Sequence, residues 1–301
     1  MLKLNGIYPP LPTSFDINEN LAPDKMRENV RKLSKYDLAG FLVLGSNGEL
    51  VNLTEKEKLN VYEMARDVIP SNKLMIAGTG GQSTRETIEL TKAAANTGTD
   101  AVLVLNPSYY KSLMSSTSLT SHYFAVAEAS PVPVIIYNMP ANSGLDMNAD
   151  TIVEIATHPN IIGMKDSGGN MVKMGDIRLR VKPEFQILAG SAGFLLPAMS
   201  VGAIGGILAL ANIAPKQCVE IYESFVAGDI TKARKMQLEM IPVNDAVTSK
   251  WGIPALKEAM DHLGLYGGPS RKPILPVTSD VKSELIHILN KNNIKPQLKT
   301  T

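Results

Sequence analysis

A single lysine ends a short apolar run in the segment 160–169, which reads Asn-Ile-Ile-Gly-Met-Lys-Asp-Ser-Gly-Gly. Such a run is typical of a buried strand, and lysine is among the residues least often buried without a partner. Because Lys165 would lose hydration there, the neutral amine is favoured, and this nucleophile can condense with a ketone. Lys165 is therefore the candidate Schiff-base residue, unless its side chain reaches solvent or pairs with the adjacent Asp166.

Other reactive side chains also stand at or just beyond the ends of short apolar runs. Tyr137 ends one run, where its hydroxyl could relay protons or simply be satisfied in the core. Ser46 and Asn47 stand between two glycines, a pattern that indicates either a turn or a carboxylate site built from backbone amides and side-chain donors. Segment 106–110 and Ser191 follow two further runs. The joint occurrence of these groups favours a substrate site.

Metal and nucleotide chemistry are poorly matched by the sequence. The glycines of segment 78–81 place Ser83 where a dinucleotide-binding loop needs its last glycine, and segment 189–193 lacks the first glycine of a nucleophile elbow. None of the histidines stands at metal-pair spacing, which disfavours a metal-dependent aldolase or hydrolase. The four histidines are His122, His158, His262 and His287. We therefore expect chemistry without a metal or an organic cofactor, in which the imine itself accepts the electrons.

The composition also narrows the class of protein. Thirty basic and 29 acidic residues leave a net charge of +1, and no basic run is interleaved with aromatics, which disfavours nucleic-acid and membrane-surface partners. The lone Cys218 excludes an internal disulfide and a thiolate zinc cluster. The first residues lack the pattern of a secretory signal, and no apolar stretch reaches about 18 residues. We expect a cytoplasmic protein that acts on a small molecule.

These side chains need a framework that brings strand ends together. Short apolar runs alternate along the chain with polar-faced segments long enough for helices. This alternation predicts an α/β fold, the (β/α)8 TIM barrel, in which the chemistry lies at the C-terminal ends of the strands. An open doubly wound sheet is the structural alternative, but it usually has a phosphate-binding glycine loop after its first strand. The predicted strands are residues 6–13, 40–44, 74–77, 101–105, 134–137, 161–165, 185–188 and 205–208.

Helix signals support the same organisation. Thr54 with Glu57, and Ser83 with Glu86, fit the capping box, in which each side chain satisfies the other residue's backbone N–H. The predicted helices include residues 56–68, 84–95 and 215–226 of the barrel, followed by 230–243, 254–263 and 279–289. We therefore divide the chain into a catalytic barrel, residues 1–227, and a C-terminal helical extension, residues 228–301. The polar tail from residue 290 is expected to be mobile.

Three motifs resemble those of the pyruvate-dependent class I aldolase family, which includes dihydrodipicolinate synthase and N-acetylneuraminate lyase. They are Gly-Ser-Asn-Gly-Glu at 45–49, Tyr-Asn-Met-Pro at 137–140 and Gly-Met-Lys-Asp at 163–166. The resemblance implies a Schiff base at Lys165, a proton-relay role for Tyr137, and carboxylate recognition by Ser46 and Asn47. It also implies that the backbone at Ile207 lines the pyruvate pocket.

The resemblance has implications for assembly as well. In many members of the family, a tyrosine in the loop after the fourth strand reaches into a neighbouring subunit. That role would fall to Tyr110 or, as the second choice, to Tyr109. Homodimers paired into tetramers are usual in the family, so we expect a homodimer or a homotetramer.

Departures from the synthase pattern suggest a substrate. Dihydrodipicolinate synthases typically have two threonines at the positions of Ser46 and Asn47, and an arginine for the aldehyde's carboxylate at the position of Asn142. An asparagine does not replace the charged, bidentate contact of a guanidinium. These positions resemble instead 4-hydroxy-2-oxoglutarate aldolase, which implies cleavage to pyruvate and glyoxylate. Ser167 and Ser191 would then help to bind the substrate.

Other functions remain open at this point. The main rival is a dihydrodipicolinate synthase that joins pyruvate with aspartate semialdehyde, and a 2-keto-3-deoxy sugar acid aldolase comes third. A non-catalytic keto-acid sensor would keep the binding residues without turnover. An intact pair of Lys165 and Tyr137 argues against the sensor, because binding alone does not require both.

Overall fold

The structure, a computed structural model, describes residues 2–296. Its centre is an eight-stranded parallel sheet in the order β1-β8-β7-β6-β5-β4-β3-β2. Backbone hydrogen bonds from Ala39 N to Ile7 O (3.0 Å) and from Leu42 N to Pro9 O (3.1 Å) join the two outer strands. The strands are β1 (Gly6–Tyr8), β2 (Gly40–Val43), β3 (Leu74–Gly78), β4 (Ala101–Leu105), β5 (Val134–Asn138), β6 (Ile161–Asp166), β7 (Gln186–Ala189) and β8 (Gly205–Ile207). The predicted TIM barrel is therefore confirmed, and the open sheet is wrong.

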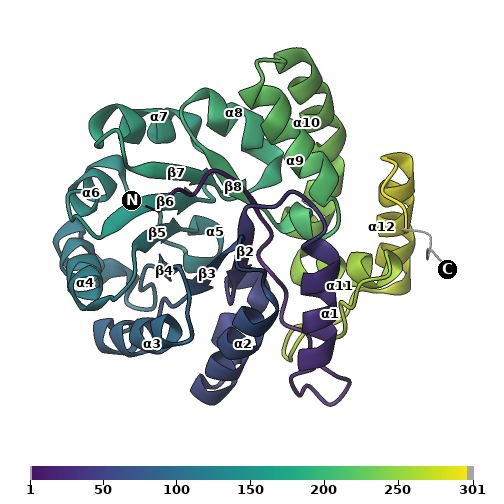
Figure 1. The fold of residues 1–301 in the computed structure, drawn as a ribbon, viewed down its shortest axis with the longest axis horizontal. Helices are drawn as coiled ribbons and strands as arrows, with labels where there is room; N and C mark the ends of the chain where they lie inside the picture. The colour runs from purple at the N-terminus through teal and green to yellow at the C-terminus, as the bar shows by residue number, and fades with distance from the viewer. Residues whose placement is uncertain (1, 297–301) are drawn as a thin grey trace.

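Helices surround the barrel, and the last three gather on one side of it (Figure 1). They are α1 (Pro23–Leu33), α2 (Glu55–Val68), α3 (Thr84–Asn96), α4 (Ser116–Ala129), α5 (Pro140–Ser143), α6 (Ala149–Ile155), α7 (Met171–Arg180), α8 (Leu195–Ser200), α9 (Pro215–Val226), α10 (Ile230–Asp245), α11 (Gly252–His262) and α12 (Ser279–Lys291). A π-helical turn, η6 (Ala246–Lys250), joins α10 to α11. Within residues 2–296, no helix is long and apolar enough to cross a membrane.

Most predicted boundaries agree with the structure to within two residues, but the first strand is shorter than predicted. It ends at Tyr8 rather than at Thr13. The prolines of segment 9–12 explain the difference, because a proline has no N–H for the strand ladder.

Of the two predicted capping boxes, only one is complete. Thr54 and Glu57 bond reciprocally, with Thr54 N donating to Glu57 Oε2 (2.9 Å) and Glu57 N donating to Thr54 Oγ1 (3.3 Å). Ser83 accepts from Glu86 N (3.1 Å), but the carboxylate of Glu86 accepts from Gln82 N (3.2 Å) instead. The predicted bond to the Ser83 side chain is therefore confirmed, and the predicted return bond from Ser83 N to the Glu86 carboxylate is wrong.

Two layers of apolar side chains form the core. The inner layer fills the barrel with residues from the strands, including Tyr8, Ile135 and Leu188. The outer layer lies between strands and helices and extends without a break to Leu256 in α11 and Leu285 in α12. The helices that follow residue 227 therefore pack on the barrel through the same hydrophobic cluster as the barrel helices.

The tail prediction is wrong where the structure describes the tail. Helix α12 continues to Lys291, and Ile294 is buried in the outer layer of the core. An apolar contact made beyond the helix holds this part of the chain against the body of the protein. Residues 297–301, which the same prediction covered, lie outside the described residues.

A buried ion pair links the barrel to α11. Lys257 Nζ lies 2.7 Å from Glu49 Oε1, and the two side chains are 1% and 0% exposed. Lys257 also donates to Pro269 O (2.8 Å), and Arg271 N donates to Glu49 Oε2 (2.9 Å). Burial lowers the pKa of Lys257, and the Glu49 carboxylate opposes that change. The Glu49 carboxylate therefore favours the charged form of Lys257 at a place where both side chains are almost completely buried.

We expect Lys257→Met to lower the free energy of unfolding by about 3–5 kcal/mol, because it leaves the Glu49 carboxylate buried without a counterion. Adding Glu49→Gln in the same chain should recover part of the loss. Urea unfolding followed by circular dichroism measures both. Arg85→Met is the control, because the Arg85–Glu89 pair lies at the surface and should have no measurable effect. A decrease in the free energy of unfolding below about 1 kcal/mol in Lys257→Met would show that the pair does not stabilise the packing of α11 on the barrel.

Candidate active site

Lys165 and Tyr137 lie side by side at the C-terminal end of the barrel. They are register partners on the neighbouring strands β6 and β5, so their side chains point to the same face of the sheet. The side chain of Lys165 is only 4% exposed, and its Nζ lies 4.2 Å from the centre of the Tyr137 ring. Tyr137 Oη and Ser46 Oγ are 3.2 Å apart and share a hydrogen bond. An amine, a phenol and a hydroxyl thus form a contiguous group.

The adjacent carboxylate, Asp166, does not pair with Lys165. Alternation along β6 turns Asp166 to the other face of the strand. There it accepts from Gly168 N (2.8 Å) and Asn138 Nδ2 (2.9 Å), and it lies 3.6 Å from Lys173 Nζ. Within residues 2–296, no carboxylate forms an ion pair with Lys165, and its nearest described partner is the ring of Tyr137.

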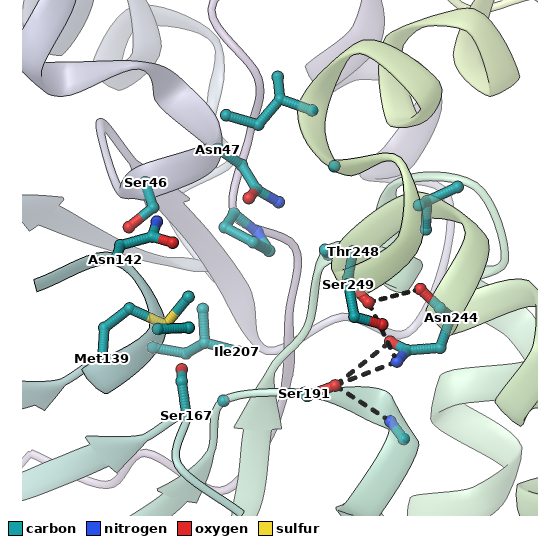
Figure 2. A pocket seen from close by; sticks show the side chains of 18 of the residues that line it. Ser46, Asn47, Met139, Asn142, Ser167, Ser191, Ile207, Asn244, Thr248 and Ser249 are labelled. Atoms are coloured by element: carbon teal, nitrogen blue, oxygen red, sulfur yellow. Dashed lines mark hydrogen bonds between the residues drawn. The ribbon is translucent and has the colours of Figure 1, made fainter. Parts of the chain in front are cut away.

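All the residues predicted for the site except Tyr110 line one cavity of about 730 Å³ at this end of the barrel. They are Lys165, Tyr137, Ser46, Asn47, Asn142, Ser167, Ser191 and Ile207. Figure 2 shows Ser46 and Asn142 close together on one side of the cavity and Ser191 on the other, with Ser167 and Ile207 between them. The fold therefore brings together side chains from strands and loops that are far apart in the sequence.

Two buried polar atoms of the cavity have no hydrogen-bond partner among the described residues. They are Asn47 Nδ2 and Ser167 Oγ. Buried polar groups are normally paired, because an unpaired one loses its hydration without compensation. These two atoms are therefore available to a ligand that enters the cavity.

Close contact between two loops sets the place of Ser167. A Cβ atom on Gly190 would lie 2.0 Å from Ser167 Oγ and 2.6 Å from Asp166 O. Gly190 N also donates to Asp166 O (2.7 Å), which ties the loop after β7 to the end of β6. Only glycine allows this approach, so the loop after β7 holds the Ser167 hydroxyl at the cavity wall.

Tyr110 and Tyr109 do not line the cavity of their own chain. Both lie in the loop after β4, with exposed fractions of 66% and 79%. Their rings meet edge to face, with the centroids 5.0 Å apart. The predicted role of Tyr110 in the site of a neighbouring subunit is not tested by a single chain, and it stays a prediction.

Sequence reasoning missed one wall of the cavity. Asn244 at the end of α10, with Thr248 and Ser249 in η6, contributes polar side chains from outside the barrel (Figure 2). The prediction ended the helix at Val243 and gave no role to the residues beyond it. A signal was present, because Pro242 interrupts a helical pattern and polar residues follow it. Irregular helical turns of this kind often occur at functional sites.

The side chains that could ligate a metal ion are dispersed in the part of the chain that the structure describes. Within residues 2–296, no group of three or more His, Cys, Asp or Glu side chains is arranged to hold one. His122, for example, is buried in α4, where its Nδ1 lies 2.9 Å from Thr84 Oγ1, and burial lowers its pKa to about 4. The polar groups of the cavity are thus a lysine, hydroxyls, amides and the carboxylate of Asp245.

Comparison with known proteins gives one consistent family. Residues 3–292 match the model of the Dihydrodipicolinate synthetase family. A relative named probable 4-hydroxy-2-oxoglutarate aldolase, mitochondrial, from Emericella nidulans is 40% identical over 285 residues, which cover 93% of this chain and 92% of the relative.

Solved structures give the same result. Dihydrodipicolinate synthase DapA-2 from Bacillus anthracis is 32% identical, with a TM-score of 0.93 and coverage of 96% of this chain and 99% of the other. YagE from E. coli K12, described as a prophage protein of the dihydrodipicolinic acid synthase family and solved in complex with pyruvate, is 28% identical. Its TM-score is 0.91, and the match covers 97% of this chain and all of that chain (100%).

Proposed function

The chain belongs to the dihydrodipicolinate synthetase family, whose members are lyases and aldolases, and we propose that it cleaves 4-hydroxy-2-oxoglutarate to pyruvate and glyoxylate. One observation carries the proposal: the unpaired amine of Lys165 lies against the ring of Tyr137 in the cavity. The 40% identity to a protein named as a probable 4-hydroxy-2-oxoglutarate aldolase supports the choice of substrate.

The proposed reaction begins with an imine. The neutral amine of Lys165 attacks the C2 ketone, a proton from solvent lets the former ketone oxygen leave as water, and a protonated imine remains. Tyr137 relays the proton of the C4 hydroxyl: its oxygen accepts that proton while its own hydrogen passes to Ser46, whose hydrogen passes to solvent. The C3–C4 bond then breaks, its electrons pass to the iminium as an enamine, and glyoxylate leaves. Protonation at C3 and addition of water release pyruvate and restore the amine, with no metal or organic cofactor in any step.

Apart from Lys165 and the carboxylate of Asp245, the polar groups of the cavity wall are hydroxyls and amides, which suit a keto acid. Asn47 Nδ2, which has no partner among the described residues, and the hydroxyl of Ser46 are suited to the C1 carboxylate. Ser167 and Ser191 are the proposed donors to the other half of the substrate, and the backbone at Ile207 lies between the two groups. Of the described residues that line the cavity, Lys165 is the only lysine, and none is an arginine or a histidine. Among these described residues, no arginine thus accompanies Asn142.

The rival functions differ in the half of the substrate that is not pyruvate. A dihydrodipicolinate synthase is the first rival, because DapA-2 from Bacillus anthracis has the same fold at 32% identity. A 2-keto-3-deoxy sugar acid aldolase would place the hydroxyls of its substrate against the polar side chains of the cavity wall, and a keto-acid sensor would bind without turnover. The proposal includes a homodimer or homotetramer in which Tyr110 completes a partner's site. It also includes a cytoplasmic location, whereas the Emericella nidulans relative is named as mitochondrial.

Borohydride reduction in the presence of pyruvate should attach a reduced pyruvyl group to Lys165 and inactivate the enzyme, because hydride traps an imine as a stable amine. Peptide mass mapping identifies the modified residue. Lys165→Met should abolish trapping, whereas the matched change at an exposed lysine, Lys92→Met, should not. An adduct found only on other lysines would overturn the assignment.

Tyr137→Phe should slow turnover by about 10²-fold or more while still allowing imine formation, because it removes a proton relay and keeps the nucleophile. Steady-state cleavage and the rate of borohydride trapping, measured on the same preparation, separate these effects. Turnover close to that of the wild type would assign Tyr137 a structural role. An equal loss of trapping would point to general damage of the site.

Cleavage of 4-hydroxy-2-oxoglutarate should exceed condensation of pyruvate with aspartate semialdehyde by at least about 10-fold in kcat/KM. The reason is the neutral Asn142, since a lost charged hydrogen bond is worth about 1.5–3 kcal/mol. Coupled assays of both reactions on one preparation measure the ratio. A preference for aspartate semialdehyde would make the synthase the correct function and leave the proposed roles of Lys165 and Tyr137 unchanged.

A further inference from the structure

The wall of the cavity opposite Ser46 is built by residues from two parts of the chain. Ser191 comes from the loop after β7, and Asn244 comes from the last turn of α10, outside the barrel. Figure 2 shows the two side chains in contact at the edge of the cavity, with Thr248 and Ser249 next to them. The side chain of Asn244 is almost completely buried, with 2% exposure, yet it lines the cavity.

The hydroxyl proton of Ser191 makes only a long hydrogen bond among the described residues. Its Oγ accepts from Asn244 Nδ2 (3.1 Å) and from Gly193 N (3.2 Å). A hydroxyl has two lone pairs and one hydrogen, so both acceptor positions are in use. The acceptor for its hydrogen is Asn244 Oδ1 at 3.4 Å, which is long for an O–H donor. A ligand oxygen at a normal distance would therefore take this hydrogen.

The position of this donor suits the proposed placement of the substrate. If Ser46 and Asn47 hold the C1 carboxylate and Lys165 bonds to C2, the remaining carbons extend away from Ser46. The wall they then approach holds Ser191 and Asn244 (Figure 2). A cavity of about 730 Å³ has room for the whole chain of the substrate between the two walls.

We propose that Asn244 is a positioning residue, which holds the Ser191 hydroxyl as a donor to the half of the substrate that leaves as the aldehyde. This inference rests on the proposed function of the same cavity. It assigns part of the substrate selectivity to a helix outside the barrel, because α10 supplies the amide that orients a barrel-loop hydroxyl.

A matched residue on the same helix, Gln237, serves as the control that distinguishes a positioning role of Asn244 from a purely structural one. Gln237 lies about two helical turns earlier on α10 and contacts the turn that follows Ser191. It accepts from Leu196 N (3.0 Å) and donates to Ala192 O (2.8 Å), and it is also buried. Gln237 does not line the cavity, so it fastens the helix to the turn without touching a ligand.

The test compares Asn244→Ala with Gln237→Ala, using 4-hydroxy-2-oxoglutarate for cleavage and pyruvate alone for borohydride trapping. Asn244→Ala should raise KM for cleavage by about 10-fold, the worth of one hydrogen bond, and leave the rate of pyruvate trapping unchanged. Pyruvate lacks the half of the substrate that would meet Ser191. Gln237→Ala should lower the melting temperature and leave KM within about 2-fold of the wild type.

A double-mutant cycle tests whether Asn244 acts through Ser191. The combined variant, Ser191→Ala with Asn244→Ala, should have the same KM as Ser191→Ala alone. Full additivity, an unchanged KM in Asn244→Ala, or an equal loss of pyruvate trapping would each overturn the inference. Failure of the wild type to trap pyruvate would overturn the proposed function instead. If Asn244→Ala does not fold, Asn244→Asp keeps the size of the side chain and removes its N–H donor, and it should raise KM in the same way.

Discussion

The cavity depends on the ion pair between Glu49 and Lys257, because this pair joins its two sides. Glu49 comes directly after the turn that holds Ser46 and Asn47, and Lys257 lies in α11, which follows η6. Removing two charges from water is costly, so the pair is stable only with good geometry and additional hydrogen bonds, which both partners have. Glu49 also has a positive φ of 54°, an unfavourable conformation for a residue with a side chain. The contacts of its carboxylate compensate for that strain and fix the turn.

The two faces of β6 have different electrostatic environments. Lys165 points into the cavity, where it has the ring of Tyr137 for a neighbour. Asp166, one residue later, points the other way and joins Asn138, Lys173 and Asp146. The ammonium of Lys173 compensates for carboxylates that would otherwise lie unpaired behind the nucleophile. Strand alternation thus places a lysine and an aspartate next to each other in sequence but in separate networks.

The sequence was sufficient to predict the barrel and most of the cavity, because both follow from local patterns. A buried strand in a parallel barrel is a short apolar run, and its last residues mark the catalytic end, so local pattern alone places Lys165 and Tyr137. Asn244 could not be placed in this way, since its position depends on how α10 packs against the loop after β7. The hydrogen-bond partner of the Glu86 carboxylate was predicted wrongly for a similar reason. Whether the carboxylate accepts from the N–H of Gln82 or from that of Ser83 depends on the local backbone geometry.

The π-helical turn η6 is a place where the side chains that face the cavity can change while the strands of the barrel keep their register. One residue added to or removed from a helix rotates everything beyond it by about 100°, and a π turn is a place where a helix already holds an extra residue. Such a change next to Thr248 would present different side chains to the cavity while the strands, with Lys165 and Tyr137, kept their register. New specificities could therefore arise in evolution by insertion or deletion at this joint, provided that Lys257 of α11 keeps its contact with Glu49.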